Sequence, residues 1–329
     1  MPSDENVIAL WGPSGSGKTW LVRSLRQSLG LFNNDEDLDW EFTVQDVDTG
    51  DEILLSTEAP PLEATLGPDT RQYLVTRRPK PPASRRPRTI VNTHTHHLQV
   101  RDIQGDWTWN RDSQDGITRD TTRVNFENAT AIIIALDHTL LNKSTARNIP
   151  TTELSSTQDD IDYTLDEDGN GSSPTGGGGT SRTEWVDRVT GLTAELKKTK
   201  RNYRIAVCVT KIDQSELRHW DANQVIESLY GSRMKERLID LRKHFSVKEF
   251  CVSSAGFLSD NMETPNFDQA TTGLRDAKYW RPYNVHAPFF WLFEEQERER
   301  LAGQGNSLAK LLFSEHRLRM HAPYPGTDV

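Results

Sequence analysis

The sequence predicts an α/β protein built on a doubly wound, mostly parallel β-sheet. Short apolar runs at residues 7–11, 131–136, 205–209 and 250–252 are typical of buried strands. Segments with apolar residues at helical spacing alternate with these runs, as in α/β folds. A glycine-rich stretch at 12–19 stands between the first strand and a helix, which is the order expected at the start of such a sheet.

Composition sets limits on the class of protein. The chain has 329 residues and a formal net charge of -9, so we expect no general attraction to nucleic acid. Its mean hydropathy of -0.69 indicates that part of the chain is solvated. The two cysteines, Cys208 and Cys251, lie in apolar runs and form no C-x-x-C pair, which fits a reducing compartment. No membrane anchor or signal-peptide pattern is seen, so we expect a cytoplasmic protein.

The glycine-rich stretch fits the phosphate-binding pattern G-x-x-x-x-G-K-[ST], the P-loop. Glycines allow backbone N–H groups to approach phosphate oxygens, and the following helix N-terminus favours negative charge. Lys18 would reach the β- and γ-phosphates, and the Thr19 hydroxyl would bind Mg²⁺. The expected nucleotide-binding residues of this stretch are Gly12, Ser14, Gly15, Ser16, Gly17, Lys18, Thr19 and Trp20.

Two stretches of opposite charge follow the first helix. Residues 35–52 are acidic and contain no Lys or Arg, and residues 77–88 are basic and rich in proline. We interpret both as solvated loops, and the alternative is a partner-binding surface beside the nucleotide. Residues 72–75 and a run from 89 to 100 predict two antiparallel strands joined by the basic loop.

The remainder divides into one domain with an insertion. Residues 144–182 are rich in Ser, Thr, Asp and Gly and predict a disordered, low-complexity insertion. Residues 1–143 and 183–303 would then form a single domain. Residues 304–329 are expected to form a C-terminal helix and a loose tail.

Apolar spacing predicts three further helices in the second part of the domain. The first has Trp185, Val189 and Leu196 on one face, and the second is a single long amphipathic helix over 225–241. A terminal helix over 288–301 would place its phenylalanines on the sheet.

Three more polar motifs follow predicted strands. Asp102 and Gly105 form D-x-x-G, Thr210 to Asp213 form T-K-x-D, and Ser253 to Gly256 form S-S-A-G. Because ligands of open parallel sheets bind outside the carboxyl ends of the strands, we expect all four motifs at one edge.

These four motifs, in this order, resemble the signature of Ras-like and translation-factor-related P-loop GTPases. A closer resemblance is to prokaryotic double-GTPase-type proteins. It rests on the long segment before the D-x-x-G motif, on Trp107 and Trp109 after it, and on residues 282–285. The resemblance implies a GTPase domain with GTP or GDP and Mg²⁺ as its ligands.

The resemblance also implies roles in recognising the base. Asp213 would accept hydrogen bonds from the guanine N–H groups, and the Lys211 stem would lie over the ring. The backbone of Ser254 and Ala255 would contact the guanine oxygen. Thr210 stands where the family more often has Asn.

By the same resemblance, the remaining residues would serve the metal and the γ-phosphate. Asp102 would hold Mg²⁺ through water, together with Thr19 and a threonine of the first switch. We place that threonine at Thr65, with Thr70 as the alternative. The expected catalytic residues are Lys18, Thr65, Gly105 and Asp106.

The position after Gly105 is Asp106, where Ras-like proteins usually carry a water-orienting Gln. We therefore expect slow intrinsic GTP hydrolysis that accelerates when a partner, or an Arg of 77–88, supplies a cation. The expected function is a GTP-binding switch that signals to a protein effector or responds to an activating protein. The alternatives are a GTP-gated scaffold that does not hydrolyse GTP and a P-loop ATPase.

Overall fold

The structure of the protein is a computed structural model. It describes residues 5–13, 15–33, 40–46, 69–79, 94–102, 126, 129–141, 181–259, 262–268 and 273–292. Within these residues lie a seven-stranded central sheet and helices on both of its faces.

The sheet has seven strands in the order β2-β3-β4-β1-β5-β6-β7. Their bounds are β1 Glu5–Trp11, β2 Trp40–Asp46, β3 Asp69–Pro79, β4 His94–Asp102, β5 Ala131–Asp137, β6 Arg204–Thr210 and β7 Ser246–Cys251. β4, β1, β5, β6 and β7 run parallel, and β3 and β2 complete one edge in antiparallel pairs. The predicted α/β fold with a doubly wound, mostly parallel sheet is confirmed.

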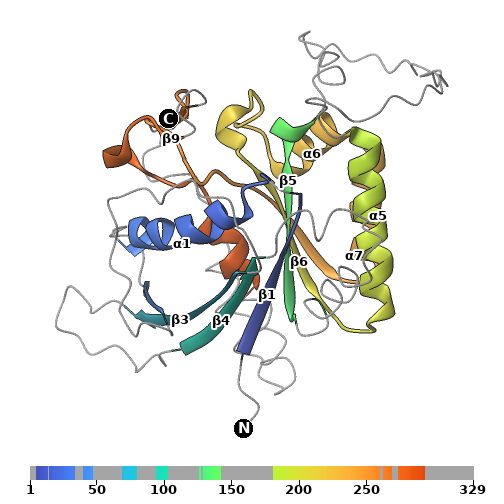
Figure 1. Ribbon diagram of the computed structural model, residues 1–329, viewed down its shortest axis with the longest axis horizontal. Helices are drawn as coiled ribbons and strands as arrows, with labels where there is room; N and C mark the ends of the chain where they lie inside the picture. The colour runs from blue at the N-terminus through green and yellow to red at the C-terminus, as the bar shows by residue number, and fades with distance from the viewer. Residues whose placement is uncertain are drawn as a thin grey trace.

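Helices cover both faces of this sheet (Figure 1). α1 (Lys18–Asn33) and the helical residues 286–292 lie on one face. α5 (Arg182–Lys198), α6 (Ala222–Tyr230) and α7 (Ser232–Arg242) lie on the other. No helix in the described ranges is long and apolar enough to cross a membrane.

β5 shows why the sheet occupies the centre. Every residue of this strand is buried. Ile132 and Ile134 pack toward α5–α7, and Ile133 packs toward α1 and the 286–292 helix. Side chains alternate between the faces of a strand, so an unbroken apolar run fits a strand covered on both sides. Burying one such side chain stabilises the fold by roughly 1.5–3 kcal/mol.

Two predicted elements are confirmed in outline. β3 and β4 pair antiparallel, with Gln72 opposite Gln99, as predicted for these strands. α5 buries Trp185, Val189 and Leu196 on one face. It begins at Arg182, inside the segment assigned to the insertion, because the Ser181 hydroxyl accepts a hydrogen bond from Glu184 N and caps the helix.

Two predictions about local structure are wrong. The single helix expected over 225–241 is two helices, because Gly231 between them has a φ of 84° and lies outside the helical region. The acidic stretch is not only a solvated loop, since β2 forms inside it and pairs with β3 from Trp40 to Asp46. Trp40, Phe42 and Val44 alternate with polar residues there, which is the spacing of a strand.

Several predicted segments lie outside the described residues. These are most of the insertion, residues 144–180, and everything after residue 292. The expected insertion, the C-terminal helix and the tail therefore stay predictions, and so does the basic loop beyond Pro79.

Candidate functional site

The candidate site lies at the carboxyl edge of the parallel strands. β1 leads into Gly12, β5 ends at Asp137, and β6 ends at Thr210. Asp137 and Thr210 are register partners. Asp102, the last residue of β4, lies opposite Leu10 of β1. Leu10 is two residues before Gly12, the start of the glycine-rich loop. The sheet therefore brings the starts of the four predicted motifs to one edge.

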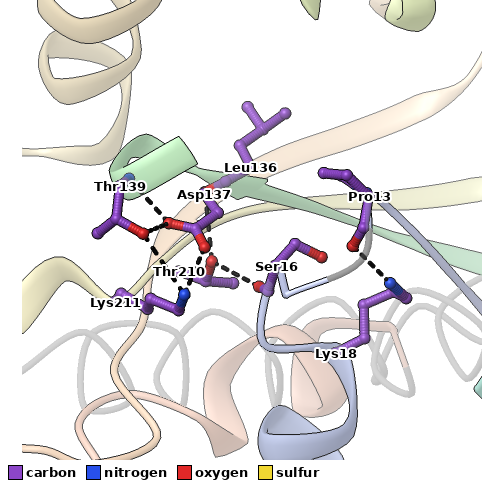
Figure 2. Close-up of polar contacts among 8 residues, drawn as sticks. All are labelled: Pro13, Ser16, Lys18, Leu136, Asp137, Thr139, Thr210 and Lys211. Atoms are coloured by element: carbon purple, nitrogen blue, oxygen red, sulfur yellow. Dashed lines mark hydrogen bonds and ion pairs between the residues drawn. The ribbon is translucent and has the colours of Figure 1, made fainter. Parts of the chain in front are cut away.

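The glycine-rich loop turns tightly between β1 and α1. Gly15 and Gly17 have φ values of 77° and 83°, which most side chains disfavour. The buried Lys18 ammonium donates to the carbonyl oxygens of Gly12 (2.9 Å) and Pro13 (2.8 Å), the second of which is drawn in Figure 2. These bonds hold the ammonium beside the loop, and Thr19 follows in the first turn of α1.

Thr210 ties the end of β6 to this loop. Its hydroxyl Oγ1 donates to the Ser16 carbonyl oxygen at 2.8 Å and lies 3.4 Å from the Leu136 carbonyl oxygen (Figure 2). Thr210 is 4% exposed, so the bond is shielded from water. The hydroxyl at this position thus links the T-K-x-D motif to the glycine-rich loop, a role that the motif itself does not specify.

Asp213 is a buried carboxylate with one unused oxygen. Asp213 is 2% exposed to solvent. Oδ1 accepts a hydrogen bond from Ser253 Oγ at 2.5 Å, whereas Oδ2 has no hydrogen-bond partner among the described residues. Burial raises the pKa of Asp213 to about 6, although the Ser253 hydrogen bond and the Lys211 charge act in the opposite direction.

The S-S-A-G motif forms a compact turn around the Ser253 hydroxyl, which also accepts a hydrogen bond from Gly256 N at 2.8 Å. Gly256 has a φ of 73°, and a Cβ atom there would lie 1.6 Å from the Arg281 carbonyl oxygen, so only glycine fits. Trp280 Nε1 donates to the Ser254 carbonyl oxygen at 2.8 Å. The Trp280 ring also makes an edge contact with Trp20, 6.4 Å between centroids, and so connects this turn to α1.

Lys211 is held by a residue that sequence reasoning missed. Its ammonium lies 2.6 Å from Asp137 Oδ2 and 3.4 Å from Thr139 Oγ1 (Figure 2). Lys211 has a left-handed backbone with φ 57°. The available sequence signal for Asp137 was its place directly after the apolar run 131–136; its pairing with Thr210, the first residue of T-K-x-D, comes from the strand register.

The other expected site residues divide into two groups. Asp102 is the last residue of β4, and Thr70 lies within β3 opposite Arg101; their roles stay predictions. The remaining ones, Ser14, Thr65, Gly105 and Asp106, lie outside the described residues, so their roles stay predictions.

The sequence matches no known family model and no curated protein. Two solved structures show a distant likeness. One is a protein of Plasmodium falciparum described as nucleolar GTP-binding protein 1, with 11% identity, coverage of 96% of this chain and 97% of that chain, and a TM-score of 0.39. The other is the signal recognition particle receptor SRb-GTP/SRX complex from Chaetomium thermophilum, with 15% identity, coverage of 76% and 94%, and a TM-score of 0.39.

Proposed function

We propose that this protein is a guanine-nucleotide switch that binds GTP and hydrolyses it slowly with Mg²⁺. The observation that carries the proposal is Asp213, a buried carboxylate whose Oδ2 atom has no hydrogen-bond partner in the described part of the chain. A buried carboxylate oxygen without a donor is unfavourable, so the position favours a ligand that supplies N–H groups.

Guanine supplies donors of the right kind. Its N1–H and 2-amino groups lie on one edge of the ring, and an ionised carboxylate only accepts hydrogen bonds. Adenine has an acceptor at N1 and no 2-amino group. Each hydrogen bond to a charged group contributes roughly 1.5–3 kcal/mol, so two of them would favour guanine by about 100-fold or more.

The glycine-rich loop would hold the phosphates of the same nucleotide. Lys18, fixed by two loop carbonyls, would supply positive charge beside the β- and γ-phosphates. Thr19, in the first turn of α1, and Asp102, opposite Leu10 in register, have backbone positions that fit a Mg²⁺ site. Thr65 would complete that site, and the ion would neutralise phosphate charge when bound.

Slow hydrolysis is proposed because Asp106 follows Gly105 where an uncharged water-orienting group would be expected. A carboxylate there adds negative charge near the γ-phosphate. A protein partner that supplies a cation would then accelerate hydrolysis, and an effector would read the GTP-bound state. The same residue favours a second function, a scaffold that binds GTP without hydrolysing it.

Calorimetric titration of the full chain with GDP and with ADP tests the nucleotide preference. We expect GDP to bind at least about 100-fold more tightly than ADP, and Lys18→Met to weaken binding of both nucleotides by removing a phosphate contact. Equal affinity for the two nucleotides in the wild type would contradict the proposed role of Asp213.

A single-turnover assay with GTP and Mg²⁺ separates the slow enzyme from the scaffold. We expect conversion to GDP over minutes to hours, and faster conversion by Asp106→Gln. Retention of unhydrolysed GTP by both proteins would favour the scaffold.

A further inference from the structure

Asp137 is a fully buried carboxylate at the end of β5, and nothing in the proposed nucleotide contacts uses it. Its side chain is 0% exposed. Oδ1 accepts hydrogen bonds from Thr139 N at 2.8 Å and from Thr139 Oγ1 at 2.7 Å. Oδ2 lies 2.6 Å from the Lys211 ammonium. Two hydrogen bonds therefore fix Oδ1, and Oδ2 is held by the ion pair, since it makes no hydrogen bond among the described residues (Figure 2).

The pairing with Lys211 is required by the burial. A carboxylate removed from water is strongly destabilising unless a cation and hydrogen bonds compensate it. Within the described part of the chain, the Lys211 ammonium supplies the positive charge that pairs with the Asp137 carboxylate. The Lys211 side chain is 30% exposed, so its charged end is anchored while part of the side chain faces solvent.

We propose that Asp137 is a positioning residue for Lys211, which it fixes as a preformed platform for the guanine ring. This inference rests on the proposed function. A free lysine side chain loses rotamer freedom when a ligand orders it, and the ion pair orders Lys211 before the ligand arrives. Loss of the ion pair therefore accelerates nucleotide release, on the order of tenfold to thirtyfold.

The experiment measures release of a fluorescent GDP analogue, chased by excess GDP, from the full chain. Asp137→Asn keeps the shape of the side chain and removes its charge, and Lys211→Met keeps an apolar stem and removes the ammonium. We expect both single variants to release the analogue faster than the wild type does. The double variant should release it no faster than Lys211→Met, because Asp137 acts through Lys211.

Stability measured on the same four proteins separates positioning from a merely structural role. Lys211→Met leaves a buried charge unpaired and should lower the melting temperature, and adding Asp137→Asn should restore it. Release should stay fast in that restored double variant. Slow release in the double variant would overturn the inference, because the fast release of the single variants would then follow from their lower stability alone.

A matched control exists on β7. Glu249 is a buried carboxylate, 4% exposed, that pairs with Arg242 of α7 at 2.5 Å. Glu249→Gln makes the same chemical change away from the site, and should lower stability without changing the release rate. If Asp137→Asn does not fold, Thr139→Val removes one donor to Asp137 together with the Thr139 Oγ1 contact of Lys211. It should still accelerate release about threefold, but only when Lys211 is present.

Different results overturn the proposed function and the positioning role of Asp137. A wild type that retains no guanine nucleotide overturns the proposed function and this inference with it. A wild type that retains the analogue, with Asp137→Asn releasing it at the wild-type rate, overturns this inference alone.

Discussion

Asp213→Asn should stabilise the nucleotide-free protein at neutral pH, although the residue belongs to the proposed binding site. The carboxylate is 2% exposed, and burial raises its pKa from the ordinary value of 3.8 to about 6. The ionised carboxylate therefore destabilises the nucleotide-free protein, because burial removes it from water. An amide has nearly the same shape and carries no charge, so the substitution removes this desolvation penalty.

The size of the effect follows from the pKa. A difference of about two pH units, at 1.36 kcal/mol per unit, corresponds to a destabilisation by ionised Asp213 of about 3 kcal/mol. The folded state holds its proton more tightly than the unfolded state does. The penalty is therefore absent below about pH 4, grows between pH 4 and 6, and is complete above pH 6.

Urea denaturation of nucleotide-free wild type and Asp213→Asn at pH 8 and near pH 4 measures this difference. The variant should be more stable at pH 8 by about 3 kcal/mol, and the two proteins should converge near pH 4. Asp240→Asn is a control of opposite sign, because the hydrogen bond from Lys197 lowers the pKa of Asp240. A less stable Asp213→Asn at pH 8, or a gap that does not depend on pH, would refute the reasoning.

The other predictions concern nucleotide affinity and the turns around it. In Asp213→Asn an N–H group replaces a carboxylate oxygen, so the variant should prefer xanthosine diphosphate, whose ring has a carbonyl in place of the 2-amino group; competition binding that still favours GDP would contradict this. Wild-type affinity for GDP should fall as pH drops through about 6, where Asp213 gains its proton; a GDP affinity that stays constant through this range would contradict the role of the carboxylate. Thr210→Val should weaken GDP binding by about threefold to tenfold through loss of the bond to Ser16, and Thr210→Ser should restore it; equal loss in both variants would count against the link. Gly256→Ala should lower the melting temperature and GDP affinity together, because its Cβ would overlap the Arg281 carbonyl; an unchanged melting temperature would show that the turn can move.

The parts of the fold with strong periodic signals could be predicted from the sequence. The run Ile132 to Leu136 is apolar without interruption, and the structure buries it on both faces. The order of strand, glycine-rich loop and helix around Lys18 placed that loop at the carboxyl edge. These features depend on local composition, which the sequence displays directly.

Features that depend on pairing across the sheet could not be predicted. Asp137 forms its ion pair with Lys211, which is distant in sequence and is brought close only by the β5–β6 register. The Thr210 hydroxyl likewise acts through Ser16, 194 positions away. The break at Gly231 is local, yet glycine occurs inside helices often enough that apolar spacing on both sides outweighed it.

A competition between nucleotides tests the proposed guanine preference most directly. The full chain is incubated with equimolar GTP and ATP and with Mg²⁺, isolated at intervals, and its retained nucleotide is identified by chromatography. We expect the wild type to retain guanine nucleotide and to convert the bound GTP slowly to GDP. Retention of adenine nucleotide, or of none, would contradict the role of Asp213 in base recognition, on which the proposed function depends.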